Sequence, residues 1–167
     1  VSVSSYVFIE EFGLSNTLYG VYYAAGACMS LLGPIIYIVL YRFMKRREIV
    51  HFALFLLVCA AVILLLAGKI SPILFLAGVI PMLIVEGIMR PLTMVVVLEE
   101  HASVAGTASS LMQFVVNMVG VLGTTIATLQ WTSMTIGVGV IAAGCAVLGL
   151  VSWFVLLRRR MMLAFLQ

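Results

Sequence analysis

Charged residues are scarce in this sequence. Of its 167 residues only 9% are charged, whereas 65% are hydrophobic and the mean hydropathy is +1.29. A soluble domain carries about 25% charged residues, and a chain of this length cannot enclose so much apolar surface in water. The composition therefore excludes a water-soluble domain and indicates an integral membrane protein.

The patterns of several other protein classes are also missing. Cys28, Cys59 and Cys145 stand in apolar runs without CxxC or Cys/His spacing, which argues against a zinc site or a disulfide framework. The net charge of +3 comes from basic loops and not from a nucleic-acid-binding patch. We find no nucleophile–base pair, metal cluster or phosphate loop, so we expect no enzyme activity, cofactor, metal or nucleic acid.

Five long apolar runs are present instead. We expect membrane spans at residues 17–43, 49–67, 72–98, 106–129 and 132–157. A helix needs roughly 20 residues to cross a bilayer, whereas barrel strands need only about 10 alternating residues. Residues 1–9 are too short to cross, and we expect them to be the end of a truncated helix. The prediction is an all-α membrane protein, a helical bundle that forms a single transmembrane domain over residues 1–167.

The connections between these runs are short, which predicts that helices consecutive in sequence are antiparallel neighbours. The connection at residues 99–104 reads "EEHASV", and we expect a solvated turn there, with His101 as a candidate gating contact. Seven of the nine basic residues fall on one side, in the "KRRE" loop and the C-terminal tail. The positive-inside rule places that side in the cytoplasm, and Trp131 then lies at the opposite interface.

Three of the five spans carry polar or small residues at every third or fourth position. In the first span these are Tyr19, Tyr22, Gly26, Ser30, Gly33 and Tyr37; in the fourth they are Gly106, Ser110, Gln113, Asn117, Gly120 and Thr124. The third span carries Glu86, Arg90 and Thr93. Such stripes either join helices through close packing and hydrogen bonds or line a cavity. The tyrosines, amides and charges favour a cavity, and both readings stay open.

Glu86 and Arg90 are the two ionisable residues in the middle of the third span. Because they are four residues apart, they share one helix face and can pair. A lone charge at this depth costs at least about 2.5–3.5 kcal/mol. Either the pair fixes the rotation of the helix, or it faces a water-filled path in which Glu86 binds a cation or proton and Arg90 holds an anion. Pro91 follows directly and can kink the helix.

The sequence resembles the second half of a major facilitator superfamily transporter. The resemblance covers nearly the whole chain and rests on "FGLSNTLYGVYYAAGACMSLLGP", on the basic loop "YRFMKRRE" and on "IMRPLTMVVVLEEHASVAGTASSLMQFVVNMVG". Within that last segment, "EEHASVAGTASSLMQF" is similar to drug–proton antiporters of the bicyclomycin/chloramphenicol-resistance type. The chain departs from the family at Arg90 and Leu92, where Gly and Asn usually flank the proline, and at Glu86.

The resemblance implies the second six-helix half of a major facilitator fold with its first helix truncated and five full spans. It also implies a multidrug, antibiotic-resistance function: proton-coupled efflux of small molecules across the bacterial inner membrane by alternating access. The partners are a small-molecule substrate, protons, the lipid bilayer and a missing N-terminal six-helix half. From the polar stripes we expect the binding residues to be Tyr22, Glu86, Arg90, Gln113 and Asn117. Two alternatives are an uptake transporter for a small anionic metabolite and a non-transporting membrane scaffold.

Overall fold

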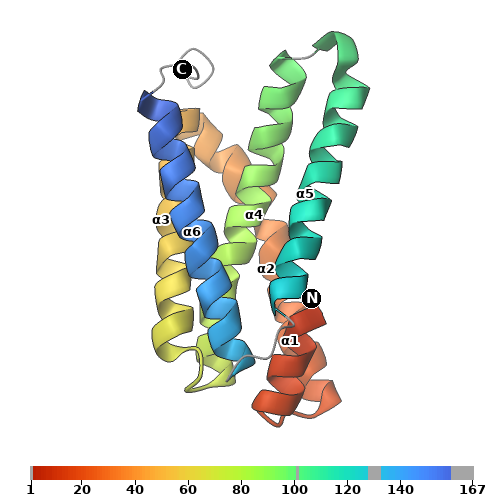
Figure 1. Ribbon diagram of the computed structural model, residues 1–167, viewed down its shortest axis with the longest axis vertical. Helices are drawn as coiled ribbons and strands as arrows, with labels where there is room; N and C mark the ends of the chain where they lie inside the picture. The colour runs from red at the N-terminus through yellow and green to blue at the C-terminus, as the bar shows by residue number, and fades with distance from the viewer. Residues whose placement is uncertain (1, 101, 128–132, 159–167) are drawn as a thin grey trace.

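The computed structural model describes residues 2–100, 102–127 and 133–158 (Figure 1), and every regular element in these ranges is helical. The chain begins with α1 (Ser2–Tyr6), which runs into the π-helical turn η1 (Val7–Glu11). The long helices are α2 (Asn16–Phe43), α3 (Arg46–Ala67), α4 (Pro72–Glu100), α5 (Ala105–Ala127) and α6 (Met134–Arg158). A 3₁₀ turn, η2 (Ala102–Val104), precedes α5.

Each of the five predicted spans is confirmed as a helix, with boundaries that shift by a turn or less. All five helices are long and apolar enough to cross a membrane. Their outward faces expose large apolar side chains such as Leu31, Leu66 and Leu148, which suits contact with lipid and not with water. The protein is therefore a multi-pass helical membrane protein.

The helix ends follow local capping rules. The Ser15 hydroxyl accepts a hydrogen bond from the Leu18 N–H at 3.3 Å and so starts α2. The Glu48 carboxylate accepts one from the Lys45 N–H at 2.9 Å at the start of α3. Gly13 has a φ of 66°, a left-handed conformation that a glycine adopts without strain, in the turn between η1 and α2.

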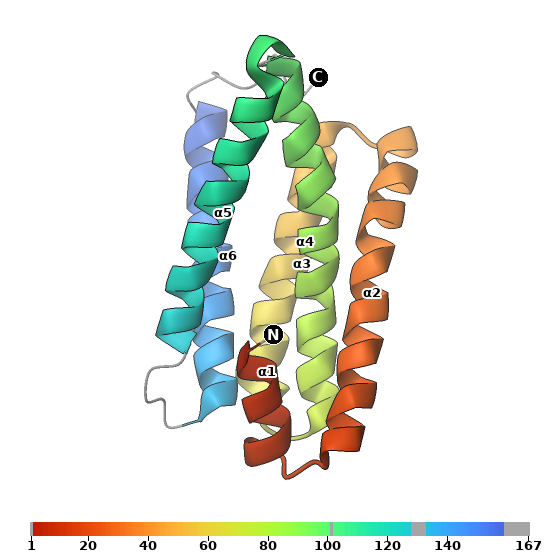
Figure 2. The ribbon, with the colours of Figure 1, turned by 90° about the vertical axis from the view of Figure 1, so that its right-hand side faces the viewer.

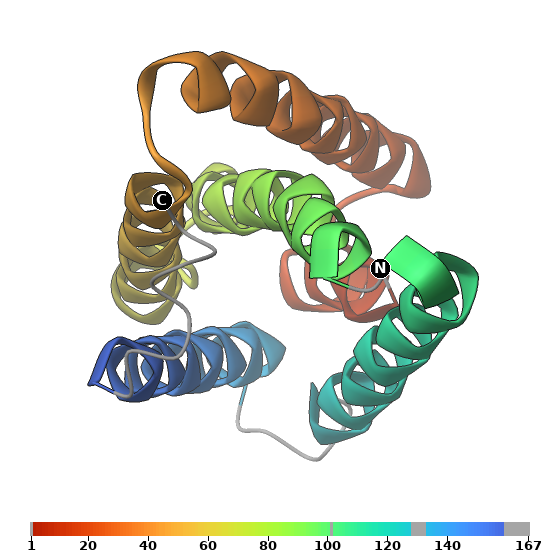
Figure 3. The same cartoon turned by 90° about the horizontal axis from the view of Figure 1, so that it is seen from above.

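The helix α4 occupies the middle of the bundle (Figure 3), with α2 on one side and α3 on another. The helix α6 packs along α3, whereas α5 stands apart from the other long helices over most of its length (Figure 2). The expectation that neighbours in sequence pack together is wrong for α2 and α3, which touch little. The cause is the glycine-bearing face of α2, which lies against α4 and not against α3.

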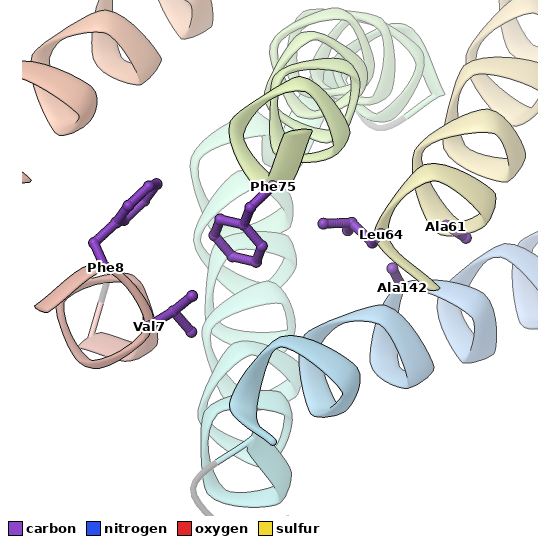
Figure 4. Close-up of a cluster of buried hydrophobic side chains, with 6 residues drawn as sticks. All are labelled: Val7, Phe8, Ala61, Leu64, Phe75 and Ala142. Atoms are coloured by element: carbon purple, nitrogen blue, oxygen red, sulfur yellow. The ribbon is translucent and has the colours of Figure 1, made fainter. Parts of the chain in front are cut away.

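Two apolar clusters hold the bundle together, one toward each end. The first joins η1, α3, α4 and α6 (Figure 4) and consists of Val7, Phe8, Ala61, Leu64, Phe75 and Ala142. The Phe8 and Phe75 rings meet edge to face in it, with centroids 5.3 Å apart. The second cluster joins α2, α3 and α4 through Tyr37, Ile49, Ile88 and Leu92. The turn η1 is thus anchored to the bundle by side chains and not by sequence proximity alone.

Basic residues gather at one end of the bundle, where α2 meets α3, and Lys69 lies at the other end between α3 and α4 (Figure 1). The turn expected at residues 99–104 is partly helical, because α4 continues through Glu100. Three predictions fall outside the described residues: a gating contact at His101, an interfacial position for Trp131, and the part of the basic side formed by Arg159 and Arg160.

Candidate functional site

The Glu86–Arg90 ion pair lies midway along α4. An oxygen of the Glu86 carboxylate, Oε1, is 2.8 Å from Arg90 Nη2, in the i, i+4 arrangement that the spacing predicts. The pair is not buried by this chain: the side chains are 56% exposed for Glu86 and 65% for Arg90. Two charges at this depth are expensive to leave against acyl chains, so the face that carries them must meet either protein or water.

Two prolines loosen the backbone beside the pair. Pro91 in α4 and Pro34 in α2 lie inside their helices, and a proline removes the N–H that would bond to the carbonyl four residues earlier. The carbonyls deprived of this donor belong to Gly87 and Ser30. Both residues line the same hollow as Glu86 and Arg90, so two helical hydrogen bonds are missing from the backbone beside the pair.

The first hollow lies between α1, η1, α2 and α4 and has a volume of about 430 Å³. Its polar part is formed by Glu86 and Arg90. Its apolar part is formed by α2 and α4 side chains, including Tyr22, Tyr23 and Leu83, with Phe8 from η1. The Tyr22 ring stacks on Phe8 with centroids 5.3 Å apart and an angle of 19° between the planes. The predicted site residue Tyr22 therefore shares a hollow with both predicted charges.

The second hollow lies between α4 and α5, has a volume of about 600 Å³ and is more polar. It is lined by Glu86, Arg90, Val116, Asn117, Gly120, Val121, Thr124 and Thr125. Glu86 and Arg90 thus belong to both hollows. The predicted site residue Asn117 faces the pair from the opposite helix, and the α5 stripe contributes Gly120 and Thr124 beside it.

The predicted site residue Gln113 reaches the second hollow through Asn117. Its Nε2 donates a hydrogen bond to Asn117 Oδ1 at 3.0 Å, one turn along the exposed face of α5. The stripe hydroxyls of Ser110 and Thr124 donate to carbonyls of their own helix at 2.9 Å. This leaves the two amides as the α5 groups best able to bond to something outside the helix. Four of the five predicted residues thus line one or both hollows, Gln113 lines neither and only bonds to Asn117, and their roles stay predictions.

The cavity reading of the α2 stripe is wrong for its later members. Gly33 and Tyr37 are buried against α4 and its cluster, so they form a helix–helix seam. A Cβ at Gly33 would come within 2.5 Å of the Gly87 Cα, which shows that the two backbones touch. Only the earlier part of the stripe, from Tyr22 to Ser30, reaches the first hollow. Small residues at helical spacing allow close approach, and here they serve that purpose.

Sequence reasoning missed contacts between distant segments. The Arg46 guanidinium at the start of α3 binds the Glu99 carboxylate at the end of α4 through two bonds of 2.6 and 2.7 Å. Arg46 also lies over the Tyr41 ring at 5.9 Å. The two partners are 53 residues apart in sequence, and no local pattern signals the pair. This contact ties the basic end of the bundle together.

Glu11 forms a second long-range contact, at the end opposite the basic loop. Its carboxylate accepts hydrogen bonds from the Thr135 N–H at 2.9 Å, from the Thr135 hydroxyl at 2.7 Å and from the Ser133 hydroxyl. These groups begin α6, so Glu11 caps that helix where its dipole is positive. Partial burial raises the pKa of Glu11, but the hydrogen bonds and nearby Lys69 outweigh it and leave the pKa below 4.5.

The chain matches no protein-family model, no curated protein and no solved structure. Within residues 2–100, 102–127 and 133–158, no three His, Cys, Asp or Glu side chains are placed to hold a metal ion. The arrangement presents one acid, one guanidinium, two side-chain amides and two tyrosines. These groups border two adjoining hollows of the described structure.

Proposed function

We propose that this chain is the C-terminal half of a proton-coupled exporter of small molecules of the major facilitator type. The proposal rests on one observation above all: a charge pair at mid-depth of a membrane helix is exposed and lines two hollows. An intramembrane ionisable pair facing a cavity is the usual mark of a substrate or ion path. A structural pair would instead be packed against neighbouring helices.

The missing partner in this proposal is an N-terminal six-helix half. Glu86, Arg90 and Asn117 are exposed, and α5 makes few contacts with the rest of the bundle. A second half that covers this face would close both hollows into a central site near the bilayer midplane. Rocking of the two halves around that site then gives alternating access.

Glu86 is the proton site and Arg90 its counter-charge. When Glu86 takes up a proton, the ion pair is broken and Arg90 is released to another partner; when the proton leaves, the pair forms again. The other titratable groups that line the first hollow are Tyr22 and Tyr23. Coupling follows because substrate and proton then both interact with Glu86.

The orientation in this proposal follows the basic residues. The end that carries Arg42, Lys45, Arg46 and Arg47 faces the cytoplasm of a bacterial cell, and the C-terminus lies on the same side of the inner membrane. The Glu11 contact then lies on the outer side. Export of toxic compounds in this direction would confer antibiotic resistance on the cell.

The test uses this chain together with its N-terminal half in proteoliposomes with an imposed pH gradient. Glu86→Gln should abolish or strongly weaken proton-driven drug efflux and flatten its pH dependence while the protein is still inserted in normal amounts. Glu10→Gln, which neutralises an exposed acid outside both hollows, is the matched control and should transport normally. Transport unchanged by Glu86→Gln would leave the pair with a structural role only.

Uptake of a small anionic metabolite is the second candidate, and the exposed Arg90 guanidinium favours it. Arg90 would bind the substrate carboxylate from either hollow. The same vesicles decide between the two: export is driven by protons moving opposite to the substrate, whereas uptake of an anion is driven by protons moving with it.

A scaffold that transports nothing is the third candidate, and it requires both hollows to be filled by protein.

A further inference from the structure

The strongest clue to the substrate is the charge balance of the first hollow. Glu86 and Arg90 neutralise each other at 2.8 Å, and among the described residues that line this hollow no other side chain carries a charge at neutral pH. The part of the site that this chain contributes is therefore neutral. A bound ligand that carries a net charge therefore gives the hollow the same net charge, at a depth where unbalanced charge is unfavourable.

Both cations and anions would leave an unbalanced charge in the hollow. A cation that pairs with Glu86 competes with Arg90 and leaves the guanidinium without its partner. An anion that pairs with Arg90 does the same to the carboxylate. Once the second half covers this face, removing one partner from the enclosed ion pair is unfavourable because the other charge stays behind. A ligand that carries both signs avoids the penalty, since each of its charges meets the opposite charge of the pair.

The pair can accept such a ligand without being broken. The ion pair uses Oε1 of Glu86 and Nη2 of Arg90. A carboxylate has a second oxygen and a guanidinium has five N–H donors. An ammonium group can bond to the remaining Glu86 oxygen while a carboxylate bonds to further Arg90 N–H groups. Because Glu86 and Arg90 are in direct contact, the two ligand charges must be only a few bonds apart, as in an α-amino acid.

The rest of the hollow selects the body of the ligand. Beyond the pair, the wall carries the rings of Phe8, Tyr22 and Tyr23 and the apolar side chains of Leu76 and Leu83. Stacked and offset rings favour an aromatic partner. A volume of about 430 Å³ suits a small molecule. The charges thus lie at one part of the hollow and the aromatic surface at another.

From these observations we infer that the first hollow binds zwitterions with a compact charged head and an aromatic or apolar body, of which an aromatic α-amino acid is the simplest example. This inference rests on the proposed function, because it names the substrate class of the same site. It goes further than the proposed function because it specifies a ligand with one positive group, one negative group and no net charge.

Three matched probes test the inference on the transporter, both halves together, in lipid nanodiscs at pH 7. They are L-phenylalanine, 3-phenylpropanoate and 2-phenylethylamine, which share the ring and differ in the head charge. Binding is measured by isothermal titration calorimetry. We expect phenylalanine to bind at least about tenfold more tightly than either single ion. A smaller preference, a reversed order or no binding of any probe overturns the inference.

Reciprocal variants supply a second test that loss of folding cannot imitate. In Glu86→Gln the hollow carries only Arg90, so 3-phenylpropanoate should become the tightest probe. In Arg90→Gln it carries only Glu86, so 2-phenylethylamine should become the tightest. Glu10→Gln is the control and should keep the wild-type order. An unchanged order in both charge variants would show that the pair does not contact the ligand head, and would overturn the inference.

The outcomes also separate this inference from the proposed function. Proton-driven transport of an uncharged drug with no preference among the probes would leave the exporter in place and remove only the zwitterion specificity. A clear preference for phenylalanine with no transport of any compound would keep the binding site and remove the transporter.

Discussion

The Gly87 Cα lies 2.5 Å from the position that a Cβ on Gly33 would occupy. The helices α2 and α4 therefore meet backbone to backbone at this point, one residue away from Glu86. A methyl group on either glycine has nowhere to go unless the helices separate. The position of α2, and with it Tyr22 in the first hollow, depends on this crossing.

Gly33→Ala should therefore destabilise the fold by about 1–3 kcal/mol, because the added methyl overpacks a contact between backbones. Thermal unfolding in detergent micelles measures the change. Gly20→Ala is the matched control in the same helix, since nothing lies within 4 Å of its Cβ position. That substitution should be neutral or stabilise the helix by up to about 1 kcal/mol. Equal effects of the two variants would contradict the crossing.

The Arg46–Glu99 pair should show a measurable coupling at the basic end of the bundle. Arg46 is 16% exposed and Glu99 52% exposed, and two parallel bonds join them. We expect a double-mutant cycle with Arg46→Gln and Glu99→Gln to give a favourable coupling that weakens as salt is added, as for other partly exposed pairs. The cycle removes the separate contribution of Tyr41 contact to Arg46. Coupling near zero would mean that the pair is only incidental.

The Glu11 cap predicts a pH dependence of stability. The pKa of Glu11 is lowered in the fold, because hydrogen bonds to the start of α6 outweigh its partial burial. The stabilisation is therefore fully present at pH values above the ordinary pKa of 4.5 and is lost as the pH falls through the lower value. Glu11→Gln should be less stable than the parent by up to about 1 kcal/mol at pH 7, and this difference should shrink as the pH falls through the lowered pKa of Glu11.

Glu10→Gln is the control for that comparison, since Glu10 is the neighbouring exposed acid and makes no described bond to α6. Its difference from the parent should not follow the same course between pH 7 and pH 3. If Glu10→Gln reproduces the whole effect, general charge repulsion and not the cap explains the pH dependence.

Water access to the second hollow can be tested with cysteine labelling. Asn117 lines that hollow, whereas Val119 lies on the opposite side of α5 and is 62% exposed. In a background without Cys28, Cys59 and Cys145, Asn117→Cys should react quickly with a charged, membrane-impermeant thiol reagent. Val119→Cys should react slowly, because lipid disfavours the thiolate. Slow labelling at both positions would support the scaffold reading.

The sequence predicted the helices well because their signal is local. Five apolar runs, each long enough to span a bilayer, were confirmed with small shifts at the ends. The Glu86–Arg90 pair could be predicted from the sequence equally well, since i, i+4 spacing places both side chains on one face. Asn117 and Gln113 bond to each other for the same reason.

What could not be predicted was which helix each face meets. Gly33 and Ser30 belong to one stripe, yet Gly33 is buried in the seam with α4 and Ser30 borders a hollow. Periodicity gives the direction in which a residue points around its helix and not the distance to the next element. Phe8, Arg46 and Glu11 were missed because their partners lie far away in the sequence.

The bare crossing of Gly33 and Gly87 also has a mechanical consequence. Two helices whose backbones touch at glycines carry no side chain at the crossing point itself and can pivot about it. Pro34 and Pro91 each remove a backbone hydrogen bond close to the crossing point and make the helices easier to bend there. Such a rotation would move the ends of α2 and α4 farthest. It would displace Glu86, which lies beside the crossing point, least. The acid would keep its depth while the openings at either end change width.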